Sequence, residues 1–83
     1  MLEILYFANF REVLGQSQET LPSDNFKTVG CVLNALAERG EQWKMALAEN
    51  TNLQIAVNHD VADRATALKA GDEIAFFPPV TGG

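Results

Sequence analysis

The sequence contains few of the residues that build disulfides, metal centres or nucleic-acid-binding surfaces. Its 83 residues include one cysteine and one histidine, which rules out an internal disulfide and a cysteine–histidine cluster with metal-ligand spacing. Six lysines and arginines are scattered along a chain of formal net charge -5, whereas phosphate binding uses clustered basic side chains. We therefore expect no bound metal and no nucleic-acid partner. The single thiol favours a reducing, cytoplasmic setting.

Long apolar segments and catalytic constellations are missing too. The apolar stretch Met1–Phe7 contains Glu3, has no basic lead and is far shorter than the roughly 20 residues of a membrane-spanning helix. We expect it to be a strand, and neither a signal peptide nor a membrane anchor. No nucleophile, base and orienting group stand at a recognisable spacing, and there is no glycine-rich loop to cradle a phosphate. We therefore expect the chain to have no active site of its own and to bind no cofactor.

The composition, 47% hydrophobic and 20% charged, is typical of one globular domain, near the lower size limit for a core without disulfides or metal. Both alternate sets of residues in Met1–Phe10 are apolar, as in a strand covered on both faces. A helical turn over Arg11–Leu14, closed by Gly15, is expected next. A polar edge strand over Gln16–Leu21, ended by Pro22, then completes an irregular hairpin.

The most regular pattern predicts a helix from Thr28 to Arg39. Thr28 can cap its N-terminus, and Gly40 stands where a C-terminal glycine stop belongs. The apolar positions follow the helical period: Val29, Val32, Leu33, Leu36 and Ala37. A second, shorter helix from Glu41 to about Ala48 turns Trp43 and Leu47 to the same side.

Short strands are expected in the C-terminal half. The pattern predicts a strand over Leu53–Val57, a tight turn at Asn58-His59 and a brief return strand over Asp60–Ala62. The turn Ala70-Gly71-Asp72 leads into a last strand, Glu73–Phe77. This order predicts an α+β fold in which one main helix packs across one face of a mixed sheet. That is the β-grasp, or ubiquitin-like, arrangement, with the domain over residues 1–77 and a flexible tail over residues 78–83.

One face of the predicted sheet has no second long helix to cover it. Strand alternation separates two apolar sets, although the parity can be reversed: Ile4, Tyr6, Ile74 and Phe76 toward the helix, and Leu5, Phe7, Ala75 and Phe77 away from it. Aromatic surface is left over in either case. Apolar burial contributes about 25 cal/mol per Å², so this face suits a protein partner. The alternative is a looser core filled by loop residues.

The side chains that could carry chemistry each have an ordinary structural reading. Cys31 falls opposite the apolar stripe in the first helical turn, where a lowered thiol pKa would suit a persulfide carrier, but an unremarkable surface cysteine is favoured. We expect His59 to occupy a turn and Trp43 to serve packing. For the acidic residues in loops and at strand ends the expectation is solvated charge: Asp60, Asp63, Asp72 and Glu73.

The C-terminal segment carries the strongest functional signal. Pro78 and Pro79 have no N–H to give a sheet, so the tail leaves the ladder there. Gly82 and Gly83 leave the final carboxylate without side-chain obstruction. A carboxylate is a poor acyl donor, but transfer of AMP to it makes a mixed anhydride that sulfur or nitrogen nucleophiles attack. Activation therefore needs a second protein and ATP.

A family resemblance rests on these residues. The stretch from Gly71 to Gly83, supported by Tyr6-Phe7-Ala8, Arg11-Glu12 and Gly15, resembles the small subunits of molybdopterin synthase, the sulfur carriers of molybdenum cofactor synthesis. The double glycine alone is shared with ubiquitin and with the thiamin-synthesis sulfur carrier. The lead-in Phe-Phe-Pro-Pro-Val-Thr is more specific.

The resemblance implies a mechanism and partners. An adenylating, E1-like enzyme that uses ATP would activate the Gly83 carboxylate, and a sulfur donor would convert it to a thiocarboxylate. On the large, catalytic subunit, the sulfur would pass to cyclic pyranopterin monophosphate to build the molybdopterin dithiolene, within a heterotetramer. Gly82 would give access to the reacting end, and the partner-binding residues would be Phe7, Arg11, Phe77, Pro78, Pro79, Val80 and Thr81. A thiamin-pathway carrier, a ubiquitin-like modifier and a plain interaction module remain as alternatives.

Overall fold

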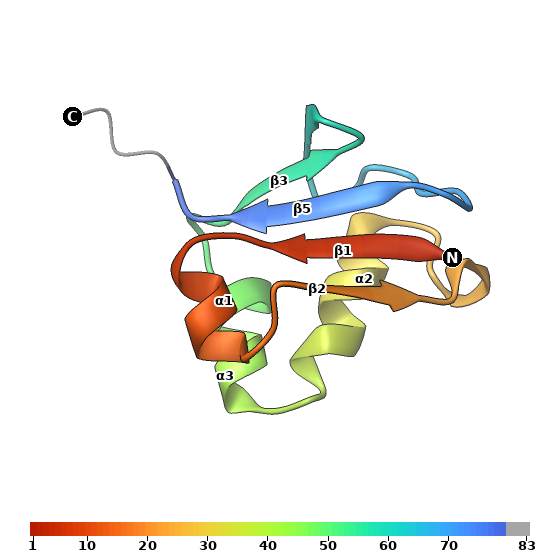
Figure 1. Cartoon of the computed structure of the whole chain (residues 1–83). Helices are drawn as coiled ribbons and strands as arrows, with labels where there is room; N and C mark the ends of the chain where they lie inside the picture. Colours follow the sequence, from red (N-terminus) through yellow and green to blue (C-terminus); the bar gives the residue numbers. More distant parts are fainter. Residues whose placement is uncertain (80–83) are drawn as a thin grey trace.

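The computed structural model describes residues 1–79 and contains a five-stranded mixed sheet in the order β2-β1-β5-β3-β4. The central strands β1 (Leu2–Tyr6) and β5 (Glu73–Phe77) run parallel. The outer strands pair antiparallel: β2 (Gln18–Leu21), β3 (Gln54–Val57) and β4 (Asp60–Ala62). Helix α2 (Val29–Ala37) lies across one face of the sheet (Figure 1). The predicted α+β, β-grasp architecture is confirmed.

Two connections between elements, at Gly15 and at Asn58-His59, have the conformations that the sequence predicted. Helix α1 (Asn9–Leu14) begins two residues earlier than expected and ends at Gly15, whose φ of 77° is the left-handed conformation of a glycine stop. A short 3-10 turn, η1 (Ser23–Asn25), links β2 to α2. Asn58 and His59 have φ of 52° and 72°, so both residues of the β3–β4 turn are left-handed, as a two-residue hairpin requires.

The predicted helix stop at Gly40 is wrong. Helix α2 ends at Ala37, and its C-cap, Glu38, keeps a right-handed helical conformation. Gly40, with φ 152°, instead precedes α3 (Glu41–Trp43), which continues into the π-helical turn η2 (Lys44–Ala48). Gly40 therefore belongs to the connection that leads into α3, and its backbone has a conformation that favours glycine.

The core lies between the sheet and the helices. The predicted parity is confirmed, because Ile4 pairs with Ile74 and Tyr6 with Phe76, and all four side chains are buried. They meet the apolar stripe of α2, Val29, Val32, Leu33 and Leu36. Leu47 is fully buried and Trp43 packs against this core, as the four-residue spacing predicted. Loop residues also pack against this core, among them Phe26, Leu53 and Leu68. Within residues 1–79, no helix covers the other face of the sheet (Figure 1).

Asp72 is not the solvated charge expected from its place in a turn. It is 4% exposed. Its Oδ1 accepts a 2.9 Å hydrogen bond from the Asn58 side-chain amide, and its Oδ2 accepts one of 2.9 Å from the Lys69 N–H. The Asn58 Oδ1 in turn accepts from the Glu73 N–H at 3.0 Å. Asp72 therefore joins the β3–β4 turn to the start of β5.

Candidate functional site

The predicted reactive end lies outside the residues that the structure describes. This applies to Val80, Thr81, Gly82 and Gly83. The described chain leaves the sheet as expected, because β5 ends at Phe77, the last residue paired with β3. Pro78 is half-buried and Pro79 is exposed. The tail therefore starts from the end of a central strand, next to the end of the parallel strand β1 (Figure 1).

An apolar row crosses the sheet on the face opposite α2, which we call the open sheet face. The strand register aligns Leu5 with Ala75, Ala75 with Ala56, and Ala56 with Val61. The row thus runs through β1, β5, β3 and β4. Val61 is 91% exposed, which is unusual for a branched apolar side chain. A continuous apolar row of this kind suits contact with another protein.

Phe7 and Phe77 lie at the tail end of the open sheet face. Phe7 directly follows β1, and its N–H donates a 3.1 Å hydrogen bond to the carbonyl of Phe76, so the two strands stay paired there. Phe7 is 45% exposed and Phe77 is half-buried. The structure therefore brings together two predicted partner-binding residues that are 70 positions apart, beside the point where the tail begins.

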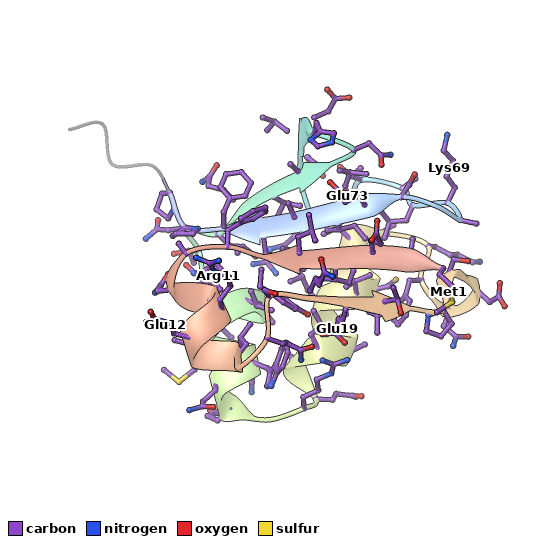
Figure 2. All side chains as sticks on the ribbon, in the orientation of Figure 1. Met1, Arg11, Glu12, Glu19, Lys69 and Glu73 are labelled. Atoms are coloured by element: carbon purple, nitrogen blue, oxygen red, sulfur yellow. The ribbon has the colours of Figure 1, made fainter. Side chains whose placement is uncertain are left out.

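Charged side chains flank this face at both ends. Arg11 is exposed on α1, beside the ends of β1 and β5 (Figure 2). At the opposite end, Glu3 and Glu73 are direct neighbours in the parallel ladder. Adjacent like charges repel each other, and a basic partner surface would relieve this repulsion. The open sheet face is thus acidic at one end, apolar in the middle, and aromatic with an arginine rim at the tail.

Cys31 is separate from this face. It is exposed on α2, on the other side of the sheet. The hydroxyl of Thr28 donates to its Sγ at 3.3 Å, and this bond, together with backbone hydrogen bonds at the helix N-terminus, holds the pKa of the thiol below its usual range. The structure does not bring Cys31 together with the other predicted site residues.

The remaining singled-out side chains have structural roles. The Trp43 ring meets the Tyr6 ring edge to face at 5.6 Å and carries the Arg39 guanidinium 4.7 Å from its centroid, which confirms the packing role. His59 occupies the β3–β4 turn, as predicted, with 89% of its side chain exposed. Within residues 1–79, no three metal-binding side chains are grouped together, and none of the helices is long and apolar enough to cross a membrane.

Val61 is the surface residue that sequence reasoning missed. A signal was available, because a two-residue turn at Asn58-His59 fixes the register of the flanking strands. That register places Val61 directly opposite Ala56, and hence in one row with Ala75. The strand pattern of Asp60–Ala62 alone is too short to reveal which face Val61 occupies.

Comparisons with known proteins agree with this fold. Residues 4–83 match the model of the ThiS family. A molybdopterin synthase sulfur carrier subunit from Haemophilus influenzae is 46% identical over 83 residues, which cover 100% of both chains. The crystal structure of SAMP1 from Haloferax volcanii superposes with a TM-score of 0.80 at 31% identity, covering 99% of this chain and 98% of that one.

A further solved structure is an assembly. A chain in the protein–protein complex of subunits 1 and 2 of the molybdopterin-converting factor from Helicobacter pylori superposes with a TM-score of 0.69 at 25% identity, covering 99% of this chain and 97% of that one. The resemblance drawn from the tail and from the first strand is confirmed by the full-length match. The chain therefore belongs to the ThiS family, and it is homologous over its full length to a sulfur carrier subunit of molybdopterin synthase.

Proposed function

We propose that this chain is the sulfur carrier subunit of a molybdopterin synthase and works in the cytoplasm without an active site of its own. The observation that carries the proposal is the 46% identity to a sulfur carrier subunit over the whole of both chains. The structure supports it with an uncovered apolar face that ends, at Phe7 and Phe77, where the tail begins. A carrier needs a docking surface and a reactive end, and this chain offers both.

The proposed chemistry takes place at the Gly83 carboxylate. An E1-like enzyme uses ATP to transfer AMP to this carboxylate, and pyrophosphate leaves. A sulfur donor then attacks the acyl carbon, AMP leaves, and the tail ends in a thiocarboxylate. Two such thiocarboxylates each deliver one sulfur to cyclic pyranopterin monophosphate on the large, catalytic subunit, and the two transfers build the molybdopterin dithiolene. Gly82 keeps both sides of the reacting carbon open.

Docking on the large subunit is assigned to the open sheet face. Phe7 and Phe77 provide aromatic anchors, Val61 extends the apolar contact to β4, and Arg11 forms the rim. Pro78 and Pro79 stiffen the base of the tail, and Val80 and Thr81 continue it toward the reacting end. The assembly is a heterotetramer with one carrier at each end of a catalytic-subunit dimer. The Helicobacter pylori complex, in which a chain of this fold is paired with a second subunit, supports such docking.

The test is the intact mass of the chain after incubation with ATP, a cognate adenylating enzyme and a sulfur source. We expect a mass gain equal to the replacement of one oxygen by sulfur, and we expect deletion of Gly83 to abolish it. An unchanged mass, with an enzyme proven active on a control carrier, would reject the carrier function and favour an interaction module.

A ubiquitin-like modifier is the second candidate, because the chain superposes with a TM-score of 0.80 on SAMP1, which is small archaeal modifier protein 1. A modifier would form the same adenylate, but a lysine amine would attack it. The product would be an isopeptide-linked conjugate on another protein. Because Lys69 is the last basic residue of the chain, trypsin would leave residues 70–83 attached to the modified lysine, and mass spectrometry would detect that remnant. A thiamin-pathway carrier is separated by whether the thiocarboxylate restores molybdopterin or thiamin synthesis in a reconstituted reaction.

A further inference from the structure

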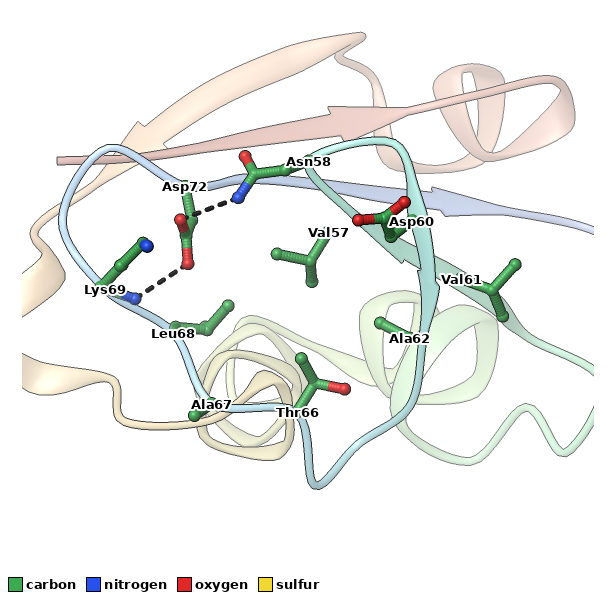
Figure 3. A pocket seen from close by; sticks show the side chains of 10 residues that line it. All are labelled: Val57, Asn58, Asp60, Val61, Ala62, Thr66, Ala67, Leu68, Lys69 and Asp72. Atoms are coloured by element: carbon green, nitrogen blue, oxygen red, sulfur yellow. Dashed lines mark hydrogen bonds between the residues drawn. The ribbon is translucent and has the colours of Figure 1, made fainter.

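A cavity of about 340 Å³ lies between the β3–β4 hairpin and the loop that leads into β5. It opens to solvent, and its lining includes neither Phe7 and Phe77 nor Pro78 and Pro79. Val57 and Ala62 form its wall on the hairpin side, and Leu68 forms the wall on the loop side (Figure 3). Val57 belongs to the face of β3 that packs toward the core, so the cavity is on the helix side of the sheet edge.

The Asp72 carboxylate lines this cavity and retains capacity to accept hydrogen bonds. Its two oxygens accept one hydrogen bond each, from Asn58 and from the Lys69 N–H (Figure 3). A carboxylate has about four acceptor positions, so about half remain unused. Within residues 1–79, no side-chain nitrogen of a lysine, arginine or histidine lies within 4.0 Å of either oxygen. A largely buried carboxylate without a cationic partner is uncommon.

Asp72 is negatively charged at neutral pH. The hydrogen bond from Asn58, followed by the one from the Lys69 amide, holds the pKa of the Asp72 carboxyl below its usual range. Burial opposes ionisation, but these two hydrogen bonds outweigh it. The cavity therefore presents a charge, and not a neutral acid, to an occupant.

The other lining charges leave the cavity negative. Asp60, at the start of β4, adds a second carboxylate. Lys69 is the one lining cation; its side chain is exposed (Figure 2), and its charge contributes to the lowered pKa of Asp72, so two carboxylates face a single ammonium. The apolar walls suit the aliphatic stem of a long basic side chain. A guanidinium suits the carboxylates better than an ammonium does, because it presents five donors in a rigid planar fork.

Val61 connects the cavity to the proposed docking surface. It lines the cavity and is also the outermost residue of the apolar row on the open sheet face. The edge strand β4 is three residues long and 91% of Val61 is exposed, so a protein that covers the row reaches the cavity around this edge. The position thus favours a side chain of a docked protein as the occupant.

We propose that this cavity receives an arginine side chain of the partner protein that docks on the open sheet face. The identity of the partner rests on the proposed function, whereas the preference of the cavity for a guanidinium is a property of this chain alone. The arginine stem lies against Val57, Ala62 and Leu68, and its guanidinium binds between Asp60 and Asp72. Neutral or acidic side chains are rejected because the carboxylates would stay unpaired.

The test uses the full-length, ¹⁵N-labelled chain and two small probes. N-acetyl-arginine methylamide is titrated, and the matching citrulline compound, which has nearly the same shape without the charge, is the control. We expect saturable amide shifts at Asn58, Asp60 and the segment 66–69 with the arginine probe, and none that saturate with the citrulline probe. Equal responses to the two probes, or no saturation with arginine, would overturn the proposal.

Two variants check that the charge of the cavity is responsible. Asp60→Asn should weaken binding of the arginine probe about two- to fivefold, the range expected for one partly exposed ion pair. Asp24→Asn removes the same charge from the exposed turn η1 and should leave binding unchanged. Equal loss in both variants would mean that only net charge matters and would reject the cavity as the site. No activating enzyme is involved, so this outcome is independent of the mass experiment.

Discussion

The hydroxyl of Tyr6 donates a 2.6 Å hydrogen bond to Oε2 of Glu19, joining β1 to the edge strand β2. Arg39 completes the arrangement, because its two terminal nitrogens each donate to a Glu19 oxygen at 2.7 Å. The same guanidinium covers the Trp43 ring, and Trp43 meets Tyr6 edge to face. Four side chains thus connect the first hairpin to the end of α2 and to α3.

We expect this cluster to make stability fall in acid. Partial burial alone would raise the pKa of Glu19, but hydrogen bonds from Arg39 and Tyr6 and the charge of Arg39 outweigh it and lower the pKa below the ordinary 4.5. A carboxylate whose pKa is lowered by folding stabilises the protein above its unfolded pKa and loses that contribution as pH falls through the lower, folded value. The loss should therefore begin near pH 4.5 and grow below it.

The variant Glu19→Gln isolates this contribution. Arg39 is 34% exposed, so solvent screens the pair, and we expect a loss of about 1 kcal/mol of unfolding free energy at neutral pH. Denaturant unfolding at neutral pH and below pH 4.5 should show a shallower acid dependence in the variant. Glu38→Gln, which changes an exposed residue without a described ion pair, is the matched control. Parallel pH profiles for Glu19→Gln and the wild type would contradict the prediction.

Thr28 is expected to act on both helix stability and thiol reactivity. Its Oγ1 accepts from the Cys31 N–H at 3.3 Å and its hydroxyl donates to the Cys31 Sγ. Thr28→Ala removes the N-cap and should reduce the unfolding free energy by about 1 kcal/mol. It should also raise the pKa of the Cys31 thiol, because the hydroxyl hydrogen bond is the largest cause of its lowering.

Alkylation rates measured against pH report the thiol directly. In Thr28→Ala the midpoint of the rate profile should move to higher pH, so the variant reacts more slowly at neutral pH. Thr51→Ala, at an exposed position in the turn before β3, should leave both the stability and the profile unchanged. An unshifted midpoint in Thr28→Ala would show that the hydroxyl does not set thiol reactivity.

The sequence predicted what depends on local pattern, and failed where contacts join distant segments. Strand alternation was enough to place Ile4 and Ile74 on the core face and Phe7 and Phe77 on the other. The Glu19–Arg39 pair spans 20 residues, so no local pattern could reveal it. Asp72 was misjudged for the same reason, since its partner Asn58 is 14 residues away and becomes its neighbour only in the folded sheet.

Helix ends and surfaces also divide into features that local sequence predicts and features that depend on distant parts of the chain. Glycine often ends helices, which predicts a helix stop at Gly40, but the short connection to α3 decides its role. The open sheet face could be predicted because the chain has one long helix for two sheet faces. The Asn58-His59 turn predicts that Val61 lies opposite Ala56, but its continuity with Ala75 also depends on the pairing of β3 with β5, which no pattern in the sequence specifies.

Docking on a large subunit should depend on the open sheet face, both at Phe77, where the tail begins, and at Val61, on the edge strand β4. Phe77→Ala should weaken the complex at least about tenfold, because truncating a desolvated aromatic anchor costs about 2 kcal/mol or more. Val61→Asp should do the same by burying an unpaired charge, without loss of stability, since Val61 is 91% exposed in the free chain. Val13→Asp, at an exposed apolar position on α1, is the matched control. Calorimetric affinities equal to wild type for both Phe77→Ala and Val61→Asp would reject this face as the docking surface.

Changes at Gly83 should separate function from folding. Among residues 1–79, the last member of the buried core is Phe76, and a glycine has no side chain to add to a core. Deleting Gly83 removes one residue of reach and places the carboxylate on Gly82, whereas adding an alanine after Gly83 puts a methyl group beside the reacting carbon. We expect either change to abolish sulfur transfer while the denaturation midpoint stays at the wild-type value. The measurement pairs thiocarboxylate formation, read from intact mass, with a thermal melt on the same preparation. Full transfer from the extended chain, with the added alanine still present by mass, would mean that the Gly83 carboxylate is not the site of sulfur loading.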